Sequence, residues 1–151
     1  MYAVSLTTPV GEIVVVEEDD YIVRVRWSSE LHRVWTPLLR EASEQIAAYF
    51  RGELTRFDLP LCPDGGAFQR TVCDAMGAIP FGQTRTYGEL AQELGACARA
   101  IGQACGNNSI PIVIPCHRVL GASGLGGFSG GVGLETKMQL LRHEGAFPYL
   151  L

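Results

Sequence analysis

The sequence predicts an α+β fold: an α/β-like N-terminal lobe with a small three-stranded sheet and one helix, followed by a mainly helical C-terminal domain. Two observations carry this prediction. Residues 1–27 contain three short segments in which apolar and polar residues alternate. Beyond residue 66, apolar residues recur at helical spacing in short segments that end at glycine or proline. The breaker-rich stretch Pro60–Gly66 separates the two parts, so we expect domains at residues 1–64 and 67–151.

The expected strands are Tyr2–Leu6, Glu12–Glu17 and Tyr21–Trp27. In the third strand the alternation predicts that Tyr21, Val23, Val25 and Trp27 share one face. A helix is expected near Pro37–Arg51, with an apolar stripe formed by Leu39, Ala42, Ile46, Tyr49 and Phe50 and with Gly52 placed to stop it. No cluster of reactive side chains stands out before residue 64, so we interpret this lobe as a scaffold.

Length and composition bound the class of protein. A chain of 151 residues with 47% hydrophobic residues has room for one packed domain or two small lobes. No apolar run is long enough to span a bilayer and no export signal opens the chain, so we expect a soluble protein without a membrane partner. We expect it to be a monomer in the cytoplasm, associated with the nucleoid in a prokaryote, or in the nucleus of a eukaryote.

The charge is unevenly distributed around a net value of −4. Residues 1–66 carry six arginines and eleven acidic residues, a net charge near −5; residues 67–151 carry five arginines, Lys137 and five acidic residues, near +1. A polyanionic partner would therefore bind the second part, although ordinary surface variation explains the difference equally well.

Five cysteines occur, at positions 62, 73, 97, 105 and 116. They form no C-x-x-C pair and no zinc-ligand spacing, and their odd number in a chain without an export signal indicates free thiols. This spacing gives no positive reason for metal binding, although scattered ligands can still meet in space. We predict no metal, and no cofactor is expected.

The second part should contain a helix-turn-helix. After a helix at Ala67–Ala78, with Phe68, Val72, Ala75 and Ile79 facing the core, Thr86 and Glu89 form a capping box that opens a second helix. A third helix is expected at Cys97–Cys105, with Ile101 and Ala104 inward and Arg99 outward. Its many small residues permit close approach, either to another helix or to a nucleic-acid groove.

The run Ile110–Leu120 is apolar, contains Pro111 and Pro115, and ends in a cysteine, a histidine and an arginine. It predicts a short buried strand that holds Cys116 rigidly where the chain becomes polar. The glycine-rich run 121–133 that follows can approach a ligand closely but contains no phosphate-loop motif. A last helix is expected at Leu134–His143, with Met138 and Leu141 inward.

The string Pro115-Cys116-His117-Arg118-Val119, preceded by Ile112-Val113-Ile114, resembles the active-site signature of O6-alkylguanine-DNA alkyltransferases (methylated-DNA–protein-cysteine methyltransferases). Four further segments resemble motifs of that family in the same order: Phe68-Gln69 with Val72, Ile79–Thr84 with Tyr87–Glu89, Ala98–Gly102, and Leu141–Gly145. The resemblance is specific over residues 67–145 and loose over the first lobe.

The resemblance implies a DNA repair protein that reverses O6-alkylguanine, and O4-alkylthymine, by one irreversible transfer of the alkyl group. Cys116 matches the alkyl acceptor, His117 the base that acts through a water molecule, and Glu144 the carboxylate that orients the imidazole. Asn108 matches the hinge before the active-site segment, and Tyr87 the hydroxyl that protonates the leaving guanine.

The DNA and pocket residues are also implied by the resemblance. Arg99 matches the residue inserted into the base stack after the nucleotide flips, and Ala98, Ala100 and Gly102 lie on the helix that contacts the minor groove of double-stranded DNA. The residues that match the guanine pocket are Pro111, Val119, Ser129 and Phe128. Three departures stand out. Phe128 replaces a tyrosine found in many relatives, and the turn at Gly95–Ala98 is about two residues shorter than expected for the family. The first lobe also shows no clear ligand set for the structural zinc that some relatives bind.

Three other functions are weighed against this one. Non-catalytic alkyltransferase-like lesion binders commonly carry tryptophan in place of the acceptor, whereas Cys116 is present here. A thiol hydrolase built on Cys116, His117 and Glu144 would need an oxyanion hole and would leave Arg99 and the helix-turn-helix without a purpose. A transcription regulator of the adaptive-response type carries an extra DNA-binding module and a second acceptor cysteine.

Overall fold

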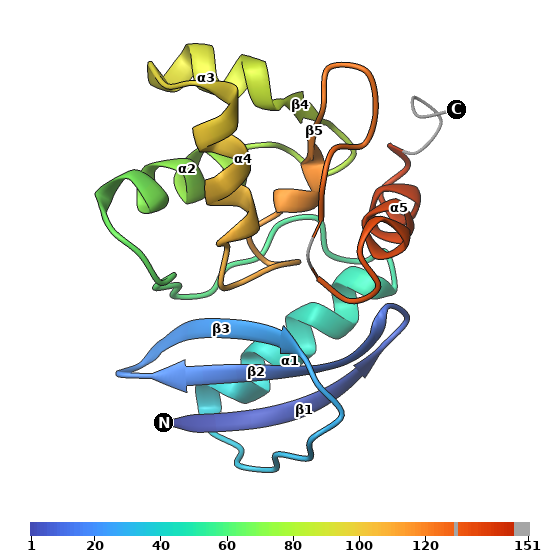
Figure 1. Cartoon of the computed structure of the whole chain (residues 1–151). Coiled ribbons are helices and arrows are strands. Elements are labelled where there is room, and N and C mark those ends of the chain that lie inside the picture. Colours follow the sequence, from blue (N-terminus) through green and yellow to red (C-terminus); the bar gives the residue numbers. More distant parts are fainter. Residues whose placement is uncertain (129, 147–151) are drawn as a thin grey trace.

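A computed structural model describes residues 1–128 and 130–146. The strands are β1 (Tyr2–Thr8), β2 (Gly11–Glu18), β3 (Tyr21–Trp27), β4 (Arg85–Thr86) and β5 (Val119–Leu120). The helices are α1 (Pro37–Phe50), α2 (Ala67–Gly77), α3 (Tyr87–Leu94), α4 (Ala98–Gly106) and α5 (Leu134–His143), with a short 3-10 helix at Cys116–Arg118. The predicted mixture of a small sheet followed by mainly helical chain is confirmed (Figure 1).

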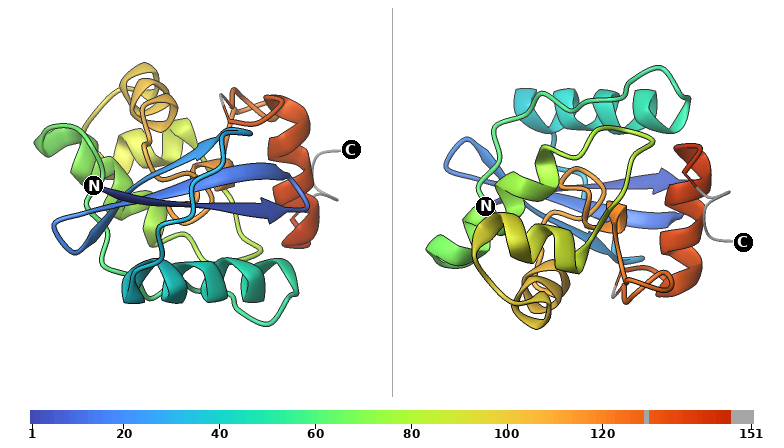
Figure 2. Two further views of the ribbon diagram at one scale, coloured as in Figure 1. Left: turned by 90° about the horizontal axis from the view of Figure 1, so that it is seen from below. Right: turned by 90° about the horizontal axis from the view of Figure 1, so that it is seen from above.

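Strands β1, β2 and β3 form an antiparallel sheet in that order. Helix α1 begins at Pro37 after an N-cap at Thr36, whose hydroxyl accepts a 3.0 Å hydrogen bond from the amide of Leu39. Its apolar stripe packs on the sheet, and Leu39, Ile46 and Tyr49 are buried as predicted. Figure 2 shows α1 running alongside the sheet, and Figure 1 shows α4 in a separate layer above both.

The predicted alternation in β3 is wrong because the strand contains a bulge. Val16 pairs with Arg24 and Glu17 pairs with Ile22, so Val23 has no partner position on β2. One extra residue reverses the side-chain alternation on either side of it. Ile22 and Val25 therefore belong to the main core, Val23 packs in a separate small cluster on the other face, and Tyr21 is exposed.

The outer edge of β3 forms hydrogen bonds to both parts of the chain, here called the N-terminal segment (residues 1–64) and the C-terminal segment (residues 67–146). The amide of Ile22 donates to the carbonyl of Pro60, and the amide of Val25 donates to the carbonyl of Ser109, both at 2.9 Å. Because these backbone groups already have partners, another strand cannot pair with them. One apolar core continues from the sheet into the C-terminal segment.

Helices α3 and α4 pack against each other, as predicted for a helix-turn-helix. Thr86 and Glu89 form both hydrogen bonds of the capping box at the start of α3, and Gly95 ends α3 in the left-handed conformation. Ile101 and Ala104 of α4 are buried as expected. Phe68 of α2 was expected in the core, and this is wrong: its side chain is 44% exposed.

The predicted strand at Ile110–Pro115 is also wrong. Backbone hydrogen bonds from Val113 to Pro111 and from Ile114 to Ile110 fold this run into successive tight turns, with Ile112 at φ +73°. Apolar composition indicated burial correctly, since Ile110 and residues 112–120 are all buried, but it did not specify an extended backbone. Strand geometry begins only at Val119, where β5 pairs in parallel with β4.

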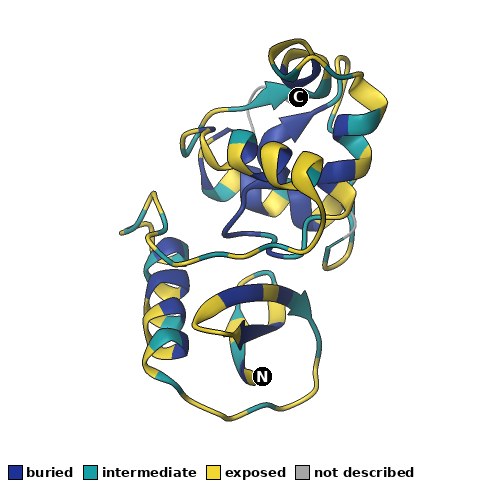
Figure 3. Ribbon diagram, turned by 90° about the vertical axis from the view of Figure 1, so that its left-hand side faces the viewer, coloured by how far each residue is buried: buried dark blue, intermediate teal, exposed yellow. Residues whose placement is uncertain are grey.

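Helix α5 completes the fold beside the glycine-rich run. Leu141 is buried as predicted, Met138 is only half-buried, and Lys137 is fully buried. Figure 3 shows buried residues gathered around β5 and on the inward side of α1, with exposed residues on the outer helices. None of the helices within the described ranges has the length and apolarity needed to traverse a lipid bilayer.

Candidate active site

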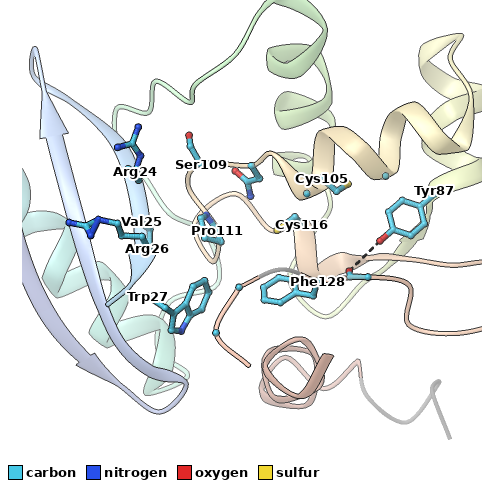
Figure 4. Close-up of a pocket in the computed structure, with 16 residues that line it drawn as sticks. Arg24, Val25, Arg26, Trp27, Tyr87, Cys105, Ser109, Pro111, Cys116 and Phe128 are labelled. Carbon is cyan, nitrogen blue, oxygen red and sulfur yellow. Dashed lines mark hydrogen bonds between the residues drawn. The ribbon is translucent and has the colours of Figure 1, made fainter. Parts of the chain in front are cut away.

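Cys116 lies at the first position of the 3-10 helix, and its amide donates a 2.8 Å hydrogen bond to the carbonyl of Ile114. The residue is 7% exposed and lines a cavity of about 830 Å³. Side chains from both segments surround this cavity: Arg24, Val25, Arg26 and Trp27 from β3, and Tyr87, Cys105, Asn108, Ser109, Pro111 and Phe128 from the C-terminal segment (Figure 4). The cysteine is therefore rigidly held but reachable from the cavity.

Asn108 holds the turns that place Cys116. Its side-chain amide donates to the carbonyl of Ile114 at 2.9 Å, and its side-chain oxygen accepts from the amide of Ile110 at 3.0 Å. The two bonds tie both ends of the turn run together. This supplies a physical reason for a hinge asparagine before the cysteine.

Glu144 lies at the centre of a buried hydrogen-bond network. Its carboxylate contacts His117 Nε2 at 2.7 Å and accepts from both Nε and Nη2 of Arg118, at 2.7 and 2.9 Å. Tyr49 of α1 adds a 2.6 Å hydrogen bond from its hydroxyl. Arg118 also donates to the carbonyl of Ile79 at 2.6 Å, so the buried guanidinium is well satisfied.

The protonation states of this network follow from burial and charge. Burial alone would raise the pKa of Glu144, but the hydrogen bonds and charges of His117 and Arg118 outweigh it and hold that pKa well below its usual range. Burial lowers the pKa of His117 despite the opposing effect of Glu144. His117 is therefore neutral at neutral pH, with its proton on Nε2 facing the carboxylate. Its Nδ1 is buried without a hydrogen-bond partner among the described residues, which leaves a free acceptor.

Burial raises the pKa of the Cys116 thiol, and the Asn108 amide and the Lys137 charge counteract this only in part. The resting side chain is a thiol at neutral pH. It needs a proton acceptor before it can act as a nucleophile, because the thiolate is the reactive form.

Lys137 is a buried cation that the sequence did not single out. Its ammonium group donates to the carbonyls of Val119, Leu125 and Gly127 at 2.6, 2.5 and 3.1 Å, tying the glycine-rich run to β5. Burial lowers the pKa of Lys137 to about 8, so the side chain is mostly charged at neutral pH. A positive charge here favours ionisation of Cys116.

Tyr87 opens α3 and faces the cavity from the side opposite β3 (Figure 4). Its hydroxyl lies 3.5 Å from the carbonyl of Gly127. Burial raises the pKa of Tyr87, which keeps the phenol protonated at neutral pH. A side chain at Gly126 would place a Cβ 2.6 Å from the ring, so the glycine lets the run lie against Tyr87.

The remaining predicted residues are spread over three places. Pro111, Phe128 and Gly102 line the cavity, whereas Val119 is fully buried and, within the described ranges, does not line it. On α4, Ala98 and Arg99 are exposed and Ala100 is half-buried. Ser129 lies outside the described residues.

The N-terminal segment, interpreted from its sequence as a scaffold, also supplies side chains around Cys116 and Glu144. Trp27 of β3 lines the Cys116 cavity, and Tyr49 of α1 hydrogen-bonds Glu144. Neither residue has a local sequence signal, because each reads as part of an apolar face. Arg118 was also not among the predicted site residues. Its position directly after the Cys116-His117 pair is the sequence signal that could have identified it.

Both parts of the chain match the domains of one known protein family. Residues 67–146 match the family described as 6-O-methylguanine DNA methyltransferase, DNA binding domain, and residues 1–63 match its ribonuclease-like domain. The chain belongs to the 6-O-methylguanine DNA methyltransferase family.

Curated relatives and solved structures of this family match nearly the whole chain. A methylated-DNA–protein-cysteine methyltransferase of Methanosarcina acetivorans is 40% identical over 97% of this chain and 99% of its own. The constitutive enzyme of Bacillus subtilis is also 40% identical, over 95% of this chain and 94% of its own. The crystal structure of the Mycobacterium tuberculosis protein in complex with DNA superposes with a TM-score of 0.84 at 39% identity, covering 97% of this chain and 94% of that one.

Proposed function

We propose that this protein repairs DNA by moving the alkyl group of O6-alkylguanine, and of O4-alkylthymine, onto Cys116. The observation that carries this is the burial of Cys116 at a cavity beside His117, whose free Nδ1 and Glu144-bound Nε2 suit it to accept a proton. The names of the relatives support the same reaction class. The protein is then a methylated-DNA–protein-cysteine methyltransferase that acts once per molecule.

The proton path follows from the tautomer of His117. The Cys116 thiol passes its proton through one water molecule to Nδ1, and the imidazolium that forms is stabilised by Glu144. The sulfur then attacks the alkyl carbon in line, so a C–S bond forms while the C–O6 bond breaks. Tyr87 donates its proton to the leaving guanine. The thioether has no easy route to hydrolysis, which makes the transfer irreversible, and no metal or cofactor is required.

The lesion must leave the base stack to reach a cavity of this kind, at a cost of a few kcal/mol. We propose that α3 and α4 bind the minor groove of double-stranded DNA, with Ala98, Ala100 and Gly102 allowing close approach. Arg99 would fill the gap in the stack. It is exposed and has no hydrogen-bond or ion-pair partner among the described residues, which supports this role.

Pocket and domain roles complete the proposal. Pro111 and Phe128 contact the flipped guanine, with Val119 behind them and Ser129 as a further pocket residue. Phe128 supplies packing without the hydroxyl of a tyrosine. Residues 1–64 and 67–151 form the two domains, and the protein acts as a cytoplasmic or nuclear monomer.

The decisive experiment is intact-protein mass spectrometry after mixing with duplex DNA that carries O6-methylguanine, followed by peptide mapping. We expect a gain of one methyl group on Cys116 and restoration of guanine, with Cys116→Ser as the unreactive control. Tight binding without a mass change would favour the non-catalytic lesion binder instead. A folded protein that neither binds nor reacts would contradict both functions.

A further inference from the structure

The Cys116 cavity extends beyond the space that a methylated base needs. Its volume of about 830 Å³ lies in the upper part of the range of pockets that bury drug-sized ligands. Figure 4 shows Tyr87 on one side of Cys116 and Trp27 on the other. The proposed function places the guanine on the Tyr87 side, because that residue must protonate it, so the opposite side is open to the rest of the alkyl group.

Trp27 forms a fixed wall on that opposite side. Its indole N–H donates a 3.0 Å hydrogen bond to the carbonyl of Val10, and its ring meets the ring of Phe128 edge to face, with centroids 6.2 Å apart at 82°. A Cβ at Gly130 would lie 2.4 Å from the Trp27 ring, so the glycine-rich run closes against the indole directly. The ring is thus held between the β1–β2 turn and the run that borders the cavity.

The geometry of the reaction directs large alkyl groups towards this wall. In an in-line displacement the leaving oxygen, the carbon and the attacking sulfur are collinear, so the substituents on that carbon project sideways from the axis. On the side away from Tyr87, the described cavity lining includes the apolar side chains of Trp27, Pro111 and Phe128, together with Arg24 and Arg26 of β3. A methyl group carries no substituent that could contact this lining, whereas a benzyl group carries an aromatic ring that could.

We propose that Trp27 is a specificity-determining residue: it is the aromatic surface on which alkyl groups larger than methyl pack during transfer to Cys116. This proposal rests on the proposed function and names the substrates that the site distinguishes. It also gives the N-terminal segment a direct part in substrate choice. Loss of the indole therefore slows transfer of bulky aromatic groups more than it slows transfer of methyl.

The test compares rate constants for transfer from duplexes that carry O6-methylguanine or O6-benzylguanine at the same position. Trp27→Leu keeps apolar volume and should lower the benzyl rate constant, relative to the methyl one, by about tenfold. Trp27→Phe retains an aromatic wall and should lose much less. Trp35→Phe is the matched control, since Trp35 is a partly exposed tryptophan of the same segment that does not line the described cavity.

Each variant is characterised by the ratio of its two rate constants, so a partly unfolded fraction affects both rate constants equally and cancels. The concentration of reactive protein is determined by titrating Cys116. An equal loss for both substrates, or a selective gain for benzyl, would overturn the proposal. Both outcomes differ from failure of the proposed function, in which the unaltered protein transfers neither group.

Discussion

The hydroxyl of Tyr49 donates a 2.6 Å hydrogen bond to Glu144 Oε2, the same oxygen that lies 2.7 Å from His117 Nε2. Tyr49 is fully buried on α1, and its backbone carbonyl also contacts His143 Nε2 at 2.7 Å. The N-terminal segment therefore holds the carboxylate that orients the imidazole beside Cys116.

Tyr49→Phe should remove this support without removing the ring. A hydrogen bond to a charged group contributes about 1.5–3 kcal/mol, and we expect the free energy of unfolding to fall by that amount in denaturant titrations. Alkyl transfer should also slow, because the Glu144 carboxylate loses one of the hydrogen bonds that fix its position. Tyr21→Phe changes an exposed tyrosine and should alter neither quantity.

Glu144→Gln should lower stability by about 3–5 kcal/mol at neutral pH, because it leaves the buried Arg118 without its counter-charge. The folded-state pKa of Glu144 is depressed, so its contribution is present above the ordinary value of 4.5 and is lost as the pH falls. The difference in unfolding free energy between the two proteins should therefore shrink on acidification below that value. Glu135→Gln, at an exposed position of α5, should leave the pH dependence unchanged.

Lys137→Met should shift the pH dependence of alkyl transfer. The Lys137 charge lowers the pKa of the Cys116 thiol, so without it the rising limb of the rate should move to higher pH. Lys137→Arg keeps the charge and should keep the limb closer to its original position. An unchanged profile in the Met variant would contradict an electrostatic effect of Lys137 on the thiol.

Arg99→Ala should slow repair of duplex DNA by about tenfold or more, because nothing then fills the stack from which the base has moved. Reaction with free O6-benzylguanine base should be unaffected, since no base pair has to open. Arg70→Ala on α2 serves as the control for loss of one exposed positive charge.

Gly130→Ala should destabilise the protein by about 1–3 kcal/mol, because the added methyl group would overlap the rings of Trp27 and Phe128. Gly124→Ala, in the same run, meets no atom within 4 Å and should cost little. Thermal unfolding of the two variants side by side checks this. Equal midpoints would mean that the run is not closed against Trp27.

Local signals predicted much of this structure. The Thr86–Glu89 capping box, the α1 stripe and the glycine ends of helices depend on neighbours within four residues, and each was confirmed. The Cys116-His117 pair and Glu144 were found through motif resemblance, and the structure brings His117 and Glu144 into contact.

Other features depend on tertiary contacts that no local pattern records. The bulge at Val23 reversed the faces of β3, and the turns at residues 110–115 depend on Asn108 bonding to both ends. Lys137 reads as a solvated helix residue because lysines are rarely buried, yet three backbone carbonyls receive it. Tyr49 contacts Glu144, which lies 95 positions away in the sequence, and local periodicity does not predict contacts at such a separation.

Lys137 is the single lysine in the sequence, and its amine is enclosed. Reagents that acylate primary amines should therefore find no accessible lysine on the folded protein and react only at the chain's own α-amino group. Coupling to an activated resin or fluorophore would then be confined to one point, which yields a uniformly oriented conjugate with Cys116 still free to react. Lysine acylation, conversely, would report unfolding of the helix that carries it.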